Sequence, residues 1–177
     1  YRLDELGKGW QVAMTTLLHE RGAGDLKTPS AGGMKSKTTH STTTSSLIDL
    51  ARNTMRNGRP ALEDPLLRDQ IMQLIIREAG LGINQRRARV AGLQDHPSRL
   101  LLQNKLLASE IAQDIGALAL EIAGASASLY LGDSNAPAGG QWPLSYMNSY
   151  GMTIAAGTSE VQRNILGERV LGLAKSK

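Results

Sequence analysis

A Gly-Thr-Ser sequence near the C-terminal end of the chain is placed to bind an oxygen atom. Ser159 and Gln162 have the spacing of a capping box, so a helix is expected to begin there. The first N–H groups of a helix have no partner within it, and the helix dipole adds positive potential at that end. Backbone donors at this turn would suit an anionic or polar oxygen. The same residues also make a simple helix cap, and both interpretations can hold.

Few other side chains in the sequence could do chemistry. Glu20 lies in a predicted helix, where a glutamate by itself is most often a solvated surface residue. His19 occupies the adjacent position, so its side chain is expected to point elsewhere, toward the surface. The arginines of 86–89 have no recognised nucleic-acid-binding motif around them, so no nucleic-acid partner is expected. The chain has no cysteine, which excludes disulfides and a thiol nucleophile, and no metal site is expected.

The net charge leaves the class of partner open. A charge of +4 and an isoelectric point of about 9.6 are compatible with an anionic partner, either nucleic acid or a nucleotide-bearing ligand, but charge alone favours a mildly basic helical surface. The sequence has no apolar run of about 18 residues, so no membrane span is expected. We expect a cytoplasmic protein.

The elements that must position these residues are helical. Helices are expected over 9–21, over 46–57, from Asp64-Pro65 onward, and from about Ser98 to about Leu129. In the last of these, apolar residues recur at steps of four, four, three and four: Leu107, Ile111, Ile115, Leu118 and Ile122. No strand pattern is convincing. The sequence therefore predicts an all-α fold, an up-and-down bundle of four main helices.

Two segments interrupt the helical pattern. From Ser36 to Ser46, nine of eleven residues are Ser or Thr without apolar periodicity. Residues 25–46 are therefore predicted to form a loop or insertion within a single domain over 1–177, with a phosphorylated segment as the functional alternative. The sequence Asn57-Gly58-Arg59-Pro60 predicts a turn, and Asp64 with Pro65 predicts the N-cap and first turn of the following helix.

The C-terminal sequence matches a family signature. Residues 157–165 read Gly-Thr-Ser-Glu-Val-Gln-Arg-Asn-Ile, and residues 168–173 read Glu-Arg-Val-Leu-Gly-Leu. This resembles the closing signature of the acyl-CoA dehydrogenases. The stretches 6–14 and 109–123 also look like family segments, the first where the middle β-domain meets the helical bundle. The resemblance covers the last third of such a protein, and the N-terminal helical domain and the β-domain are expected to be absent from this chain.

The resemblance implies a flavin-dependent enzyme. Family members use flavin adenine dinucleotide (FAD) to desaturate acyl-CoA thioesters between the α and β carbons, in fatty acid and lipid metabolism. A carboxylate removes the α-proton while a hydride leaves the β carbon, and hydrogen bonds to the thioester carbonyl stabilise the developing enolate. Family members are commonly dimers or dimers of dimers through this bundle. A homodimer or homotetramer is therefore expected, with a heteromer as the alternative. The 177 residues alone are expected to bind flavin poorly and to be inactive.

The position of the usual catalytic glutamate is occupied by Ala156, which cannot abstract a proton. A branch similar to isovaleryl- and long-chain-type enzymes places the base on the first bundle helix, in an L-x-x-E-R context that residues 17–21 match. The resemblance then implies Glu20 as base, with the backbone N–H of Ala156 on the thioester carbonyl. Burial beside flavin would raise the pKa of Glu20, because desolvation disfavours the carboxylate. The alternative is a catalytically silent subunit or assembly module.

The resemblance also implies flavin contacts. Gly157, Thr158 and Glu160 match family positions at or near the flavin, and Arg59 matches an arginine that reaches the pyrophosphate of a neighbouring subunit's flavin. Glu121 stands where the family has a glutamine, and an acidic residue there would be unfavourable beside a phosphate.

Overall fold

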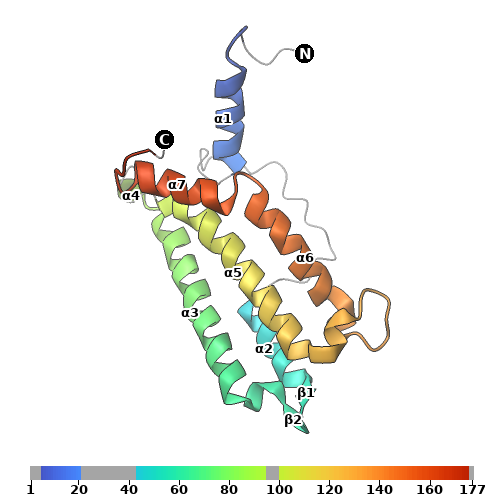
Figure 1. Ribbon diagram of the computed structural model, residues 1–177. Coiled ribbons are helices and arrows are strands. Elements are labelled where there is room, and N and C mark those ends of the chain that lie inside the picture. The colour runs from blue at the N-terminus through green and yellow to red at the C-terminus, as the bar shows by residue number, and fades with distance from the viewer. Residues whose placement is uncertain (1–4, 21–42, 95–99, 176–177) are drawn as a thin grey trace. The chain divides into compact units, whose positions relative to one another are not determined.

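The computed structural model describes residues 5–20, 43–94 and 100–175, and these segments are mainly helical (Figure 1). The α-helices have these bounds: α1 Gly9–Glu20, α2 Thr44–Asn53, α3 Pro65–Arg87, α4 Ala91–Gln94, α5 Leu100–Ala123, α6 Gln141–Ile154 and α7 Ser159–Arg169. Short elements lie between them: β1 Met55–Arg56, β2 Arg59–Pro60, and the 3-10 helices η1 Ala61–Glu63, η2 Gly124–Ser128 and η3 Pro137–Gly140. The predicted all-α fold is confirmed. Most of the predicted loop at 25–46 lies outside the described residues.

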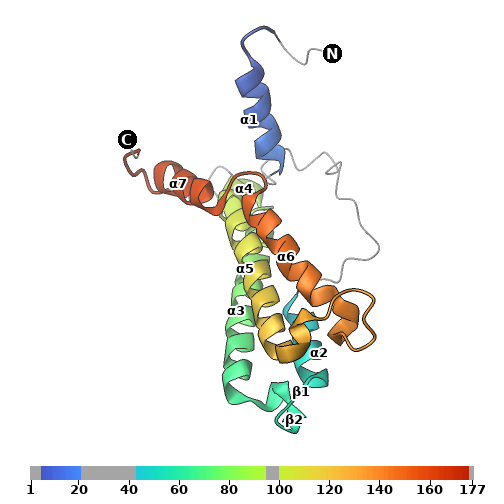
Figure 2. The same cartoon turned by 45° about the vertical axis from the view of Figure 1, so that its right-hand side comes forward.

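The chain divides into two compact units. The bundle unit comprises residues 35–83 and 107–153, and the terminal unit comprises residues 1–34, 84–106 and 154–177. The bundle unit contains α2 with most of α3, α5 and α6, and successive helices of this set run in alternating directions (Figures 1 and 2). This is the up-and-down arrangement that the sequence predicts.

The bundle unit has an aliphatic core that the apolar periodicity anticipates. On α5 the predicted residues Ile111, Ile115, Leu118 and Ile122 are buried, and on α3 Leu67, Ile71, Leu74 and Leu81 are buried. Leu107, which the same pattern includes, and Ile75 are half-buried and pack against this core. Burying one such side chain contributes roughly 1.5–3 kcal/mol, so this cluster is the main stabilising feature of the unit.

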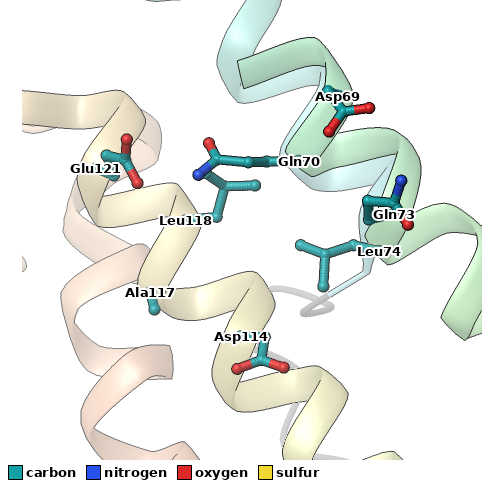
Figure 3. Close-up of a pocket in the computed structure, with 8 residues that line it drawn as sticks. All are labelled: Asp69, Gln70, Gln73, Leu74, Asp114, Ala117, Leu118 and Glu121. Carbon is teal, nitrogen blue, oxygen red and sulfur yellow. The ribbon is translucent and has the colours of Figure 1, made fainter. Parts of the chain in front are cut away.

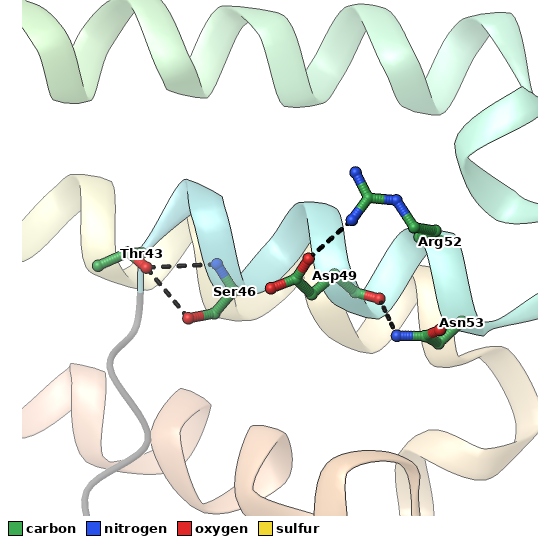
Figure 4. A network of polar contacts seen from close by, with 5 residues as sticks. All are labelled: Thr43, Ser46, Asp49, Arg52 and Asn53. Atoms are coloured by element: carbon green, nitrogen blue, oxygen red, sulfur yellow. Dashed lines mark hydrogen bonds and ion pairs between the residues drawn. The ribbon is translucent and has the colours of Figure 1, made fainter.

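Helix α2 is fixed at its N-terminus by side-chain hydrogen bonds. The hydroxyl of Thr43 accepts from the N–H of Ser46, as an N-cap does (Figure 4). Glu78 of α3 accepts from the backbone N–H of Thr44 over 3.1 Å, and from the hydroxyl of Thr44. A carboxylate at this position also complements the positive end of the helix dipole. The first turn of α2 is therefore bound to the middle of α3.

Helix α6 has one buried aromatic residue, Trp142, and it closely approaches a glycine of α5, Gly116. Trp142 is 2 % exposed and belongs to the core. Gly116 of α5 lies so close to α6 that an added Cβ would lie 3.2 Å from the Cα of Tyr146. A side chain at Gly116 would therefore have to push the two helices apart.

The segment 54–60 is a small β-hairpin, which the sequence did not predict. Met55 pairs with Pro60 and Arg56 pairs with Arg59, in antiparallel register. Asn57 and Gly58 at the tip have φ of 50° and 78°, as a two-residue hairpin turn requires. The predicted turn is thus correct, but each strand has only two residues, too few for an alternating pattern.

Helix boundaries differ from the predictions where local backbone conformation intervenes. Helix α2 ends at Asn53, because Thr54 is extended at its C-cap. The α-helical part of α5 ends at Ala123, because Gly124 has a φ of 57°, and the chain continues as η2. The predicted start of α3 is confirmed, since a carboxylate oxygen of Asp64 accepts from the N–H of Leu66 over 2.9 Å.

Candidate functional site

Helix α7 begins one residue earlier than the sequence predicts. The N-cap is Thr158, whose hydroxyl accepts from the N–H of Val161 over 3.3 Å. Ser159 is the first helical residue and is buried, so it does not cap the helix. Gln162 is one residue too far along the helix to complete a capping box with Thr158. The predicted pair of Ser159 and Gln162 is therefore wrong, although a helix does begin at this turn.

Two side-chain donors bind the carbonyl oxygens of this turn. The amide of Gln162 donates to the carbonyl of Ala156 over 3.1 Å, and the ammonium of Lys105 donates to the carbonyl of Gly157 over 2.7 Å. All of these residues belong to the terminal unit. Gln162 is completely buried and Lys105 is half-buried. Two side-chain groups therefore hold the turn by donating to its main-chain oxygens.

These contacts decide where the N–H groups of the turn point. In a planar trans peptide the N–H and the preceding C=O point in opposite directions. The N–H of Gly157 is therefore directed away from Gln162, and the N–H of Thr158 away from Lys105. Neither N–H has an acceptor among the described residues. The turn thus offers two successive backbone N–H donors to an oxygen, as a backbone nest does.

The backbone conformation of the turn is unusual for an alanine. Ala156 has a φ of 57° and Gly157 a φ of 101°, both in the left-handed region. Such a conformation costs on the order of 1–3 kcal/mol for a residue other than glycine. The hydrogen bond from Gln162 to the carbonyl of Ala156 offsets part of this cost. A strained conformation held in place next to two available donors is typical of a binding site.

Charged groups of both signs lie near the turn: the carboxylate of Glu160 with Arg163 close to it, and the ammonium of Lys105. Hydrogen bonds from its own backbone N–H and from the Thr158 hydroxyl hold the pKa of Glu160 below its ordinary value, so its carboxylate is ionised at neutral pH. The ammonium of Lys105 carries the opposite charge. The two donors of the turn therefore suit a neutral carbonyl or hydroxyl oxygen as well as a phosphate oxygen.

Arg59 lies in the β-hairpin of the bundle unit. It lines a cavity of about 200 Å³ together with Arg56, Glu63 and Asp64. Arg56 and Arg59 are opposite one another in the strand register, and like charges in this arrangement repel. The carboxylates of Glu63 and Asp64 line the same cavity and offset that repulsion, so the assignment of Arg59 to an anion stays a prediction. The register of the hairpin brings Arg56 opposite Arg59, a neighbour that the sequence analysis did not consider.

A second cavity, of about 340 Å³, lies between α3 and α5 of the bundle unit (Figure 3). Its lining includes the carboxylates of Asp69, Asp114 and Glu121. Only Asp114 has a basic partner, Arg77 at 2.6 Å, among the ion pairs of the described residues. Two carboxylates without a basic partner would thus remain beside a bound phosphate and repel it. The residues around Glu121 do not fit a flavin phosphate, and we assign no flavin contact to this cavity.

Glu20 is the last residue of α1. Its side chain, and that of His19, lie outside the described residues. The structure therefore does not test Glu20 as a catalytic base. Toward the other end of the same helix, Trp10 is 75 % exposed.

The fold and the turn together define the class of protein: an all-α domain whose last helix begins at a strained, donor-rich turn. The chain matches the family described as acyl-CoA dehydrogenase, C-terminal domain, over residues 7–171. The chain therefore belongs to the acyl-CoA dehydrogenase family.

Two curated relatives agree with this assignment. Both are acyl-CoA dehydrogenase IpdE1, one from Mycolicibacterium smegmatis and one from Mycobacterium tuberculosis. They are 31 % identical over 172 residues and 30 % identical over 174 residues, and each alignment covers 96 % of this chain. The chain spans 38 % and 39 % of their lengths, so it corresponds to less than half of either relative.

A solved structure shares the fold. The chain is similar to a chain in the crystal structure of the ChsE4–ChsE5 complex from Mycobacterium tuberculosis, with a TM-score of 0.65 and 21 % identity. The match covers 76 % of this chain and 34 % of that chain. Among the described residues, no helix combines the length and the apolar character needed to cross a bilayer.

Proposed function

We propose that this chain provides the C-terminal helical domain for flavin-dependent α,β-dehydrogenation of an acyl-CoA thioester. The observation that carries the proposal is the turn at 156–158, where hydrogen bonds to two carbonyls direct the N–H of Gly157 away from Gln162 and the N–H of Thr158 away from Lys105. Support comes from membership in the acyl-CoA dehydrogenase family. FAD, when bound, would accept the hydride that leaves the β carbon of the substrate.

In this proposal the residues of the turn contact different groups of the substrate and the flavin. The N–H of Ala156 donates to the thioester carbonyl, where it stabilises the negative charge that develops as the α-proton leaves. The N–H groups of Gly157 and Thr158, with the carboxylate of Glu160, hold oxygens and hydroxyls of the flavin. Arg59, together with Arg56, holds a phosphate of the flavin of a neighbouring subunit.

Glu20 serves as the base in this proposal. Ala156 has no side chain that can take a proton, so the carboxylate must come from another element, and the sequence around Glu20 matches the branch that uses α1. The base takes the α-proton and keeps it while the hydride departs, so charge and atoms balance within the active site.

The chain spans less than half of its curated relatives, and the whole activity therefore requires parts that these 177 residues do not supply. We expect the 177 residues alone to bind FAD weakly and to turn over no substrate. A self-associated state, as homodimer or homotetramer, or a heteromer, would complete the flavin site, because Arg59 is assigned to a neighbouring subunit's flavin.

The test uses the native assembly that contains this chain, with Glu20→Gln compared against Glu5→Gln. Glu5 is exposed and precedes α1, so its change serves as the matched control. Loss of the base should slow anaerobic bleaching of the flavin by acyl-CoA by several orders of magnitude, whereas Glu5→Gln should leave the rate unchanged. An unchanged bleaching rate in Glu20→Gln would favour the second candidate, a catalytically silent subunit, for which the alanine at position 156 is the supporting observation.

A further inference from the structure

Gln162 is a completely buried side chain whose two polar atoms are in different situations. Its Nε2 donates to the carbonyl of Ala156 over 3.1 Å, whereas its Oε1 has no hydrogen-bond partner among the described residues. Because a carbonyl oxygen can only accept, the nitrogen end of the amide must be the end that faces Ala156. The amide therefore makes one hydrogen bond at the turn and leaves a buried acceptor unsatisfied.

The amide of Gln162 adds no net stability to the folded chain. A hydrogen bond within a protein contributes modestly, because folding exchanges it for a bond to water, whereas a buried acceptor without a donor keeps the full cost of leaving water. Position 162 is the fourth of helix α7 after the Thr158 cap, where an apolar side chain commonly packs as part of a hydrophobic staple. A methionine of similar length would avoid the unsatisfied acceptor.

A second unfavourable feature lies at the other end of the same hydrogen bond. Ala156 has a φ of 57°, a conformation that a residue with a Cβ rarely adopts. One contact thus joins a strained backbone to an unsatisfied buried oxygen. Features that weaken the fold in this way concentrate at functional sites, where they fix a geometry that the function requires.

The geometry that this hydrogen bond fixes is the orientation of one peptide group. The peptide between Ala156 and Gly157 is planar, so a donor on its carbonyl also sets the direction of the N–H of Gly157. An apolar side chain at position 162 would leave that peptide without its donor, and a side chain with acceptors only would favour the opposite orientation. Only a donor at this position keeps the N–H of Gly157 directed away from Gln162.

We propose that Gln162 is a positioning residue, whose amide directs the N–H of Gly157 toward a ligand oxygen without adding net stability to the fold. That the ligand oxygen belongs to the flavin rests on the proposed function, whereas the orientation of the peptide does not. A side chain of the same length without a donor should therefore fold as well as the parent and yet fail to position the N–H.

Gln162→Met in the 177-residue chain separates positioning from stability. Its unfolding constant in urea should stay within about threefold of the parent or fall below it, because the lost hydrogen bond and the removed acceptor offset each other. The NMR chemical shift of the Ala156 carbonyl carbon should nevertheless change, because that oxygen loses its donor. Asn164→Met replaces an exposed amide of the same helix and should change neither quantity. An unfolding constant raised roughly tenfold or more in Gln162→Met, or an unchanged Ala156 shift, would overturn the proposal.

Gln162→Glu keeps the length of the side chain and makes its donor depend on pH. The protonated carboxyl can donate to the carbonyl of Ala156, whereas the ionised carboxyl only accepts. Burial and the carboxylate of Glu160 raise the pKa of the introduced group, and the ammonium of Lys105 lowers it. The Ala156 shift should match the parent while the introduced carboxyl is protonated and depart from it on ionisation, which the shift of its own carboxyl carbon reports. A parent-like Ala156 shift beside an ionised carboxyl would refute the need for a donor.

Flavin affinity in the native assembly that contains this chain tests the link to the ligand. Gln162→Met should raise the Kd for FAD roughly tenfold, as expected when one hydrogen bond to the ligand is lost, and Asn164→Met should leave it unchanged. A Gln162→Met assembly that binds FAD as tightly as its parent would overturn the positioning role. A parent assembly that binds no FAD would instead refute the proposed function, and the Ala156 shift would then decide the role of Gln162 by itself.

Discussion

Replacement of Lys105 by methionine is expected to loosen the turn before α7 while the bundle unit stays folded. Methionine keeps much of the stem of the lysine side chain but has no donor for the carbonyl of Gly157, which Lys105 now contacts over 2.7 Å. A hydrogen bond to a charged group contributes about 1.5–3 kcal/mol, and since Lys105 is only half-buried we take the lower end. About 1.5 kcal/mol corresponds to a little more than a tenfold change in an equilibrium constant.

Native-state hydrogen exchange followed by mass spectrometry measures this change locally. The opening constant of a peptide covering residues 156–163 should rise roughly tenfold in Lys105→Met, because the free energy of local opening falls by the value of the lost hydrogen bond. A peptide covering α2 should exchange as in the parent chain. Lys105→Arg retains a charged donor and should keep most of the protection.

Two results would contradict the role assigned to Lys105. Exchange at 156–163 that does not change in Lys105→Met would mean that the ammonium does not hold the turn. An equal loss of protection in α2 would mean that the substitution destabilises the whole chain, so that the orientation of the peptide at Gly157 does not depend specifically on this contact.

Two further substitutions probe the pH dependence and the packing. The lowered pKa of Glu160 means that its ionised form contributes stability above its ordinary pKa, and that this contribution is lost as the pH falls through the lowered pKa. The difference in Tm between the parent and Glu160→Gln should therefore be present at pH 7 and disappear in acid. A difference in Tm that is the same at every pH would contradict this role of the ionised Glu160 carboxylate. Gly116→Val should destabilise the chain by roughly 1–3 kcal/mol in urea unfolding, because the added atoms meet Tyr146. Gly151→Val, at a position of α6 with open space, should cost far less, and equal losses would refute the close approach.

The sequence predicts best the elements whose signals are local and repeated. The apolar period of α5 extends over several turns, so its buried residues could be named, and Asp64 with Pro65 marks the start of α3 because a cap and its helix are adjacent. The β-hairpin was missed because two-residue strands have no period. Its turn residues, Asn57 and Gly58, were visible in the sequence.

The site was harder to predict than the fold, for reasons of distance and direction. Lys105 is 52 residues away from Gly157, and no spacing rule connects the two. Gln162 was visible, but the expected capping box would have turned its side chain toward the N-cap backbone, whereas it donates to the carbonyl of Ala156.

The anchoring of α2 at its first turn has a consequence for how the segment before it can vary. Thr43 caps the helix through Ser46, and Thr44 is bound to Glu78, so both fixing contacts lie at or after Thr43. The register of α2 against α3 is therefore set within the helix and by its neighbour. The number of residues that precede Thr43 has no part in setting it, and insertions or deletions there should be tolerated without any rearrangement of the core.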